Sequence, residues 1–180
     1  MKSFNQELKS ALVAEIRKHR EQDQVIQGNY GYREEGKFRG CAVGCAIDSL
    51  FVIGGHDTPY YLCTDHGIYE RELGIPRILA ELQDVIHEGL SDESFPTWPE
   101  RFMEAVPTET DLSKVWAKFI IWLVGAFLAE KQRIVVDQNR ADMDKIMRDA
   151  ANSSGLDIKE QFYEKCAEKL IELLKAEGDE

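Results

Sequence analysis

Apolar residues recur with a helical period along most of this chain. The pattern is clearest over residues 4–24 and 76–90, where an apolar residue returns every three or four positions. The same pattern predicts five further helices, over residues 41–53, 99–106, 111–131, 136–152 and 157–176. The sequence therefore predicts an all-α fold.

Glycine and proline mark where these helices end and begin. Gly54 and Gly55 follow the helix at 41–53, and Thr58-Pro59 has the pattern of a cap that opens a short helix. Farther along, Gly74 closes one helix and Pro76 opens the next. The chain is thus divided into short, closely connected helices.

Residues 25–40 interrupt the helical period. The segment contains four glycines, and Tyr30 and Tyr32 alternate with small residues. The run from Glu34 to Lys37 has the composition of a tight turn with glycine at the left-handed position. A small β-hairpin and an ordered loop are both compatible with this pattern.

The longest apolar run extends over residues 119–129. As a helix these 11 residues reach about 16 Å, which is well short of the ~30 Å hydrocarbon core of a membrane. We therefore expect a buried helix over residues 111–131. Because large apolar side chains surround this helix, we expect it to lie at the centre of the bundle.

Length and composition indicate one domain. The chain has 180 residues, of which 43% are hydrophobic and 31% charged, and no stretch resembles a linker. We expect a single compact helical domain over residues 1–180. A net charge of −11 argues against a nucleic-acid-binding surface, which would have to neutralise phosphates.

The first twenty residues and the cysteines suggest a compartment. Residues 1–20 mix apolar with charged side chains, so they do not resemble a secretory signal peptide. The four cysteines are too few and too unevenly spaced for a disulfide framework. We expect a cytoplasmic protein with reduced thiols and no membrane partner.

Four stretches of the sequence carry a resemblance to other proteins: GKFRGCAVGCAI, LGIPRILAELQDVIHEGL, WPERFMEAVP and TDLSKVWAKFIIWL. Over about residues 25–125 the chain resembles a group of uncharacterised bacterial and phage-associated proteins. That group has no assigned activity, so the resemblance implies a single intracellular domain and brings no catalytic residues with it.

A thiol enzyme is one hypothesis for the cysteine segment. Cys41 follows a glycine and stands at the start of a predicted helix, where the helix dipole lowers a thiol pKa, and Cys45 lies one turn later. His56 or His66 would serve as the general base of a hydrolase or transferase. The alternative is that both cysteines are small buried residues of the core.

A metal site is a second hypothesis. Cys41 and Cys45 share a helical face, and Cys63 and His66 have a spacing common in zinc sites, so these four residues form a candidate ligand set. No metal or other cofactor follows from this spacing alone. The apolar neighbours of Cys41 and Cys45 favour the core instead.

The predicted helix at 76–90 offers a third group. Glu81, Asp84, His87 and Glu88 gather on its polar side, and helical bundles bind metal ions through carboxylates spaced in this way. A second helix with matching ligands is lacking. The plainer interpretation is a solvated polar face.

The acidic residues concentrate in the middle of the chain. Residues 41–112 carry 14 acidic and 3 basic side chains. This surface either serves solubility or attracts a basic protein or a cation. The sequence does not specify a function or decide whether the protein is an enzyme. The leading hypothesis is a helical interaction protein with an acidic surface, which binds a protein partner or associates with itself.

Overall fold

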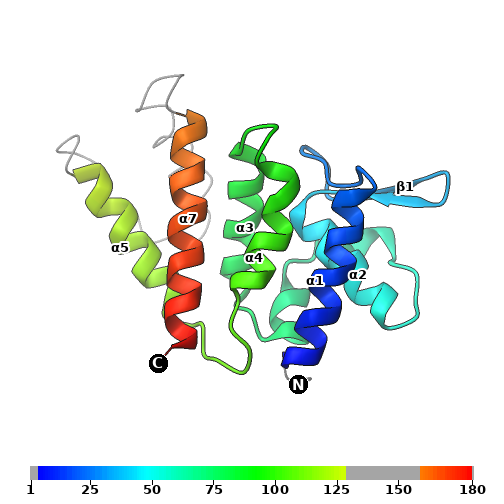
Figure 1. Cartoon of the computed structure of the whole chain (residues 1–180), viewed down its shortest axis with the longest axis horizontal. Coiled ribbons are helices and arrows are strands. Elements are labelled where there is room, and N and C mark those ends of the chain that lie inside the picture. The colour runs from blue at the N-terminus through cyan, green and yellow to red at the C-terminus, as the bar shows by residue number, and fades with distance from the viewer. Residues whose placement is uncertain (1–3, 129–158, 180) are drawn as a thin grey trace.

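The computed structural model describes residues 4–128 and 159–179 and confirms the predicted all-α class with one small hairpin (Figure 1). The six helices in these ranges are α1 (Gln6–Glu21), α2 (Ala42–Ile53), α3 (Arg77–Gly89), α4 (Trp98–Ala105), α5 (Val115–Leu128) and α7 (Lys159–Gly178). Each falls close to a range that the apolar period predicts. The helix predicted over residues 136–152 lies outside the described residues.

Three short helical turns connect these elements. They are η1 (Tyr60–Leu62), the π-helical turn η2 (Tyr69–Leu73) and η3 (Phe95–Thr97). The first confirms the short helix expected after Pro59. Gly74 closes η2 in the left-handed conformation, with φ 67°, as its position in the sequence predicts.

Residues 32–39 form a hairpin, so the structure decides between the two alternatives for this segment. Strand β1 (Tyr32–Glu34) pairs antiparallel with β2 (Lys37–Arg39). Glu35 and Gly36 make the turn with φ 51° and 80°. Positive φ at both positions is the geometry that matches the twist of a two-residue hairpin.

The main core lies between α1, α2, α3, α4 and α7. Trp98 and Phe102 on α4 are fully buried, as are Leu79, Leu82 and Ile86 on α3. These side chains belong to one continuous apolar cluster. The helices therefore share a single core in the described part of the chain.

Among the helices that the structure describes, α5 does not occupy the central position that its composition predicts. In Figure 1 it stands at the edge of the described structure, and α7 is its main partner. Phe119 and Leu123 are buried, but Ile121 is 73% exposed. An apolar composition indicates burial without saying how many neighbours a helix has, which is why the prediction of a central helix is wrong for the described residues.

Helix α1 is fastened to α4 by polar contacts. Arg17 and Arg20 both bond the carboxylate of Glu100, at 2.6 and 3.0 Å. The ammonium group of Lys9 donates to the carbonyl oxygen of Val106, 2.7 Å away. These contacts join residues that are 80 to 97 positions apart.

None of the helices described is long and apolar enough to cross a membrane.

Candidate site at the start of helix α2

Cys41 immediately precedes α2 and caps its N-terminus. Its backbone is extended, and its N–H donates to the carbonyl oxygen of Asn29 at 2.8 Å. The side chain is 1% exposed, and Sγ lies 3.2 Å from Oδ1 of Asp84 on α3. The thiol therefore meets a carboxylate from another helix inside the protein.

Two carboxylates of α3 meet this thiol. Asp84 and Glu88 are four residues apart, so they lie on one face of the helix. One ligand atom from each of Cys41, Asp84 and Glu88 lies within 4.8 Å of the other two. We call these three residues the thiol–carboxylate cluster.

Each carboxylate of the cluster also contacts a partner that is not part of the cluster. The imidazole of His66 reaches Asp84, with Nε2 3.4 Å from Oδ2. The backbone N–H of Gly28 donates to Oε2 of Glu88 at 2.8 Å. These partners fix the orientation of the two carboxylates.

The loop over residues 27–31 covers the cluster. Gln27 Nε2 donates to the carbonyl oxygens of His87 and Leu90, which anchors the loop to the end of α3. The ring of Tyr30 packs edge-on against His66, with 5.7 Å between the ring centroids. This loop thus contacts Cys41, His66 and Glu88 together.

Gly44 allows this loop to approach. A Cβ atom at this position would lie 1.5 Å from the carbonyl oxygen of Tyr30. Any side chain would therefore collide with the backbone of the loop. Glycine is required at this point of α2 because the backbone of another segment lies directly against the helix.

Burial and charge keep the Cys41 thiol protonated. Burial, reinforced by the negative charge of Asp84, raises the pKa of the Cys41 thiol far above its usual value. The N–H of Gly44 acts in the opposite direction, but burial dominates. Burial also raises the pKa of Glu88, against the stabilising bond from Gly28. The helix dipole therefore does not activate this thiol.

Cys45 belongs to a different environment. It is fully buried in a small apolar cluster with Val25, Phe38 and Cys63. Its thiol donates to the carbonyl oxygen of Gly40, 3.3 Å away. Burial raises its pKa, so it has the character of a core residue.

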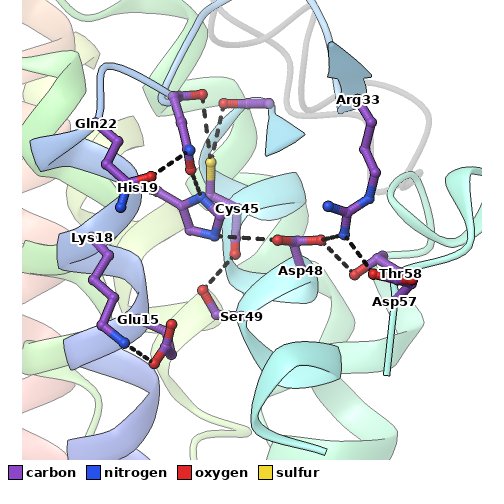
Figure 2. A network of polar contacts seen from close by, with 12 residues as sticks. Glu15, Lys18, His19, Gln22, Arg33, Cys45, Asp48, Ser49, Asp57 and Thr58 are labelled. Carbon is purple, nitrogen blue, oxygen red and sulfur yellow. Dashed lines mark hydrogen bonds and ion pairs between the residues drawn. The ribbon is translucent and has the colours of Figure 1, made fainter. Parts of the chain in front are cut away.

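Cys45 adjoins a polar network shown in Figure 2. Asp48 of α2 is 2% exposed and accepts hydrogen bonds from Thr58, at 2.6 Å, and from Arg33 of the hairpin, at 2.8 Å. His19 of α1 places Nε2 3.5 Å from the same carboxylate and Nδ1 2.5 Å from Oε1 of Gln24. This network joins α1, α2 and the hairpin, and its members satisfy one another.

Of the residues proposed for a thiol enzyme, Cys41 and His66 both contact Asp84, but His56 and Cys45 lie elsewhere. His56 follows the C-terminus of α2, whereas Cys41 caps its N-terminus, and 12 helical residues span about 18 Å. His56 is exposed and lines an apolar cavity of about 420 Å³ at the C-terminal end of α2. His66 contacts Asp84 rather than a thiol.

The four ligands proposed for a zinc site are also separated. In the described ranges, Cys41, Cys45, Cys63 and His66 do not place three ligand atoms within 4.8 Å of one another. Cys45 and Cys63 face the small apolar cluster, and Cys41 faces α3. Cys41 and Cys45 are one helical turn apart, and their thiols face different parts of the protein.

The polar face predicted for residues 81–88 is only partly solvated. Asp84 is 9% exposed and His87 is fully buried, with Nε2 3.0 Å from the carbonyl oxygen of Ile26. Glu81 pairs with Arg77 at the surface. The sequence places Asp84 and Glu88 on one side of this helix, and the structure adds that both lie beside Cys41.

Two further polar residues lie beside the cluster. Tyr69 and Gln83 are both fully buried, and the Gln83 amide lies against the Tyr69 hydroxyl and acts on its pKa. The pair does not reach the geometry of an ordinary hydrogen bond in the described structure. The motifs that the sequence offers include neither residue. A glutamine next to an aspartate in an apolar stretch is the only signal that the chain offers.

Arginines neutralise part of the acidic middle segment. Glu100 pairs with Arg17 and Arg20, and Asp65 pairs with Arg71. Other carboxylates of the segment, Asp48 and Asp84, are buried. An acidic docking surface for a protein partner thus stays a prediction, with fewer unpaired charges than the sequence suggests.

Comparison with models of known families, with curated proteins and with solved structures finds no match to this chain, so the resemblance to phage-associated proteins also stays a prediction.

Proposed function

We propose that this chain is a helical metal-binding protein, and that Cys41, Asp84 and Glu88 bind a divalent transition metal such as Zn²⁺. One observation carries the proposal: ligand atoms from these three residues lie within 4.8 Å of one another. Thiolate and carboxylate are both ligands of Zn²⁺. The set replaces the four-residue set that the spacing of cysteines and histidine suggests.

The cluster has the dimensions of a coordination sphere. Bond lengths of about 2.3 Å to sulfur and 2.1 Å to oxygen place two tetrahedral ligands about 3.5 Å apart. Cys41 Sγ and Asp84 Oδ1 are 3.2 Å apart. A metal ion could therefore enter between them with small side-chain adjustments.

The surrounding contacts suit metal binding. His66 and the N–H of Gly28 each hold one carboxylate oxygen, Asp84 Oδ2 and Glu88 Oε2. The second oxygen of each carboxylate can then coordinate the metal ion. Outer contacts of this kind commonly orient metal ligands and sustain affinity.

Electrostatics favour a cation at this position. Two carboxylates and a thiol share one partly buried space, and the charge of Asp84 raises the pKa of both Cys41 and Glu88. A divalent cation reverses this effect, because it stabilises the thiolate and the carboxylates together. Binding would release the thiol proton of Cys41.

The thiol-enzyme hypothesis has weaker support. A nucleophilic cysteine needs a low pKa and a nearby base. Burial raises the pKa of Cys41, and its observed partner is the carboxylate of Asp84. A protonated thiol against a carboxylate is a poor nucleophile, whereas the same pair is a good start for a metal site.

Cobalt titration tests the proposal. Co²⁺ added to the reduced protein should give the near-ultraviolet charge-transfer absorption of a thiolate ligand, and Zn²⁺ should displace it. Cys41→Ala should abolish this absorption. Glu88→Gln should weaken Co²⁺ binding at least tenfold, and His66→Gln should weaken it about 10- to 100-fold.

Two matched variants serve as controls. Cys166→Ala removes a thiol that is also fully buried but lies on α7, and Glu93→Gln neutralises an exposed carboxylate beyond the end of α3. Both should bind Co²⁺ like the native chain. Absence of the charge-transfer absorption in the native protein, or its persistence in Cys41→Ala, would refute the proposal.

A further inference from the structure

The apolar cavity at the C-terminal end of α2 opens to solvent. It has a volume of about 420 Å³, and Ile53 on its wall is 38% exposed. Cavities of this size with mostly apolar walls are the usual places where proteins bind other molecules. Its walls combine residues of α1, α2 and the segment around η1 and η2; the apolar ones are Leu8, Leu50, Phe51, Ile53, Leu62 and Ile68.

Exposed apolar side chains continue from this cavity. Val52 and Ile53 end α2, and Tyr60 and Tyr61 begin η1 directly before Leu62, which lines the cavity. The two tyrosines are 71% and 73% exposed. Of the six large apolar side chains that are exposed in the described ranges, four thus lie within residues 52–61. We call the cavity and these four residues the apolar patch.

The extent of the apolar patch indicates a partner larger than a small molecule. A ligand that only fills the cavity would leave Tyr60 and Tyr61 in solvent, because neither residue lines it. A contiguous exposed apolar surface with polar residues at its border is typical of a protein-binding site. Tyrosine is also among the residues that contribute most to binding at such sites.

The charges at the border of the patch are mainly negative. Glu72 of η2 lines the cavity, and Glu70 is exposed on the same turn. Neither carboxylate forms an ion pair within the described part of the chain, whereas Arg71 between them is paired with Asp65 at 2.5 Å. Asp57, which follows the end of α2, has a side chain that is 99% exposed. The patch therefore offers uncompensated negative charge beside an apolar hollow.

This charge distinguishes among the possible occupants. A second copy of the chain would bring the same carboxylates to the interface, and an anionic membrane would also be repelled. A basic partner would instead gain ion pairs and faster association.

We propose that the apolar patch binds an amphipathic helix of a partner protein that carries lysine or arginine beside its apolar face. Apolar side chains spaced by three or four residues occupy the cavity and pack against Tyr60 and Tyr61, as in other helix-in-groove complexes. The basic side chains pair with Glu70 and Glu72. This surface is separate from the thiol–carboxylate cluster, so the proposal does not depend on the metal site.

A model peptide tests the proposal. The probe is a fluorescent helical peptide of about 18 residues, with leucine on one face and lysine on the other, and its control has glutamate in place of lysine. Fluorescence anisotropy with the full chain should show binding of the leucine–lysine peptide and none of the leucine–glutamate peptide. Raising the salt from about 20 mM to about 300 mM should weaken binding, because it screens the exposed charges.

Variants at exposed positions locate the binding surface without disturbing the core. Ile53→Ser and Tyr61→Ala should each weaken binding of the leucine–lysine peptide about tenfold. Glu72→Gln should weaken it about threefold at low salt and less at raised salt. The matched controls are Ile121→Ser, at a 73% exposed side chain of α5 on the opposite side of the described structure from α2 (Figure 1), and Glu93→Gln. Both controls should bind like the native chain.

Several results would overturn this inference. They are failure of the native chain to bind the leucine–lysine peptide, equal binding of both peptides, and a loss in Ile121→Ser as large as that in Ile53→Ser. A native dimer in size-exclusion chromatography that Ile53→Ser converts to a monomer would show that a second copy occupies the patch, which also overturns it. Cys41→Ala should bind the peptide like the native chain, so the peptide and cobalt experiments can fail independently.

Discussion

Replacing Gly44 by alanine tests how closely the loop over residues 27–31 depends on α2. The added Cβ would lie 1.5 Å from the carbonyl oxygen and 2.8 Å from the carbonyl carbon of Tyr30. Both are backbone atoms, so no side-chain rotation relieves the overlap. Because ordinary contact requires about 3.5 Å, the loop must move away by about 2 Å.

The energetic cost follows from what this movement breaks. It disrupts the hydrogen bonds from Cys41 N to Asn29 O and from Gly28 N to Glu88 Oε2, each worth about 0.5–1.5 kcal/mol. Residual overlap adds about 1–3 kcal/mol, and the better helix propensity of alanine returns up to about 1 kcal/mol. We expect Gly44→Ala to lower the free energy of unfolding by about 2–4 kcal/mol.

Urea denaturation followed by far-ultraviolet circular dichroism measures this change. Gly125→Ala is the matched control, since Gly125 lies in α5 and a Cβ there meets no atom within 4 Å. The control should raise the free energy of unfolding by up to about 1 kcal/mol. If Gly44→Ala is as stable as the native chain, the loop does not lie against α2 in solution and the described site is incorrect.

Three further predictions address the core, the histidines and the thiols. Phe119→Ala should destabilise the protein by about 2–5 kcal/mol in urea, because Phe119 is fully buried; a loss below about 1 kcal/mol would show that α5 does not pack on this core. Burial lowers the pKa of both His19 and His87, so the unfolded chain binds more protons than the folded protein below pH ~6.5. The free energy of unfolding should therefore fall as the pH drops from about 7.5 to 5.5. A constant free energy of unfolding over this range would contradict the prediction. Burial raises the pKa of Cys45 and Cys166, so both thiols should react slowly in the folded protein. After brief treatment with iodoacetamide at neutral pH, mass spectrometry should find both cysteines unmodified in the folded protein and modified in urea. Rapid labelling without urea would show that these thiols are accessible.

The helices were predictable because their signals are local. The apolar period and the punctuation by Gly74 and Pro76 act within a few residues, and the turn at Glu35-Gly36 needs only its own two positions. The number of neighbours around α5 is not a local property, which explains why its apolar composition misleads.

The site was predictable only in parts. The sequence indicates Cys41 and His66 as members of the same candidate sites, and Asp84 and Glu88 as members of a separate group. Their assembly depends on how α2 and η2 pack against α3, across 43 residues between the thiol and its carboxylate partner. Spacing along one chain does not contain this information. Gln83 was missed because a single glutamine in an apolar helix carries no chemical pattern.

The ion pairs between α1 and α4 have a consequence for how the chain folds during translation. Arg17 and its partner Glu100 are 83 residues apart, and ribosomes add about 5–20 residues per second, so α1 is made roughly 4–17 s before the helix it pairs with. During this interval Leu12 and Ile16, which are fully buried in the finished protein, have only α2 and the intervening turns to cover them. The nascent chain therefore exposes an amphipathic helix for several seconds, and chaperones that recognise such helices have time to bind it before α4 completes the fold.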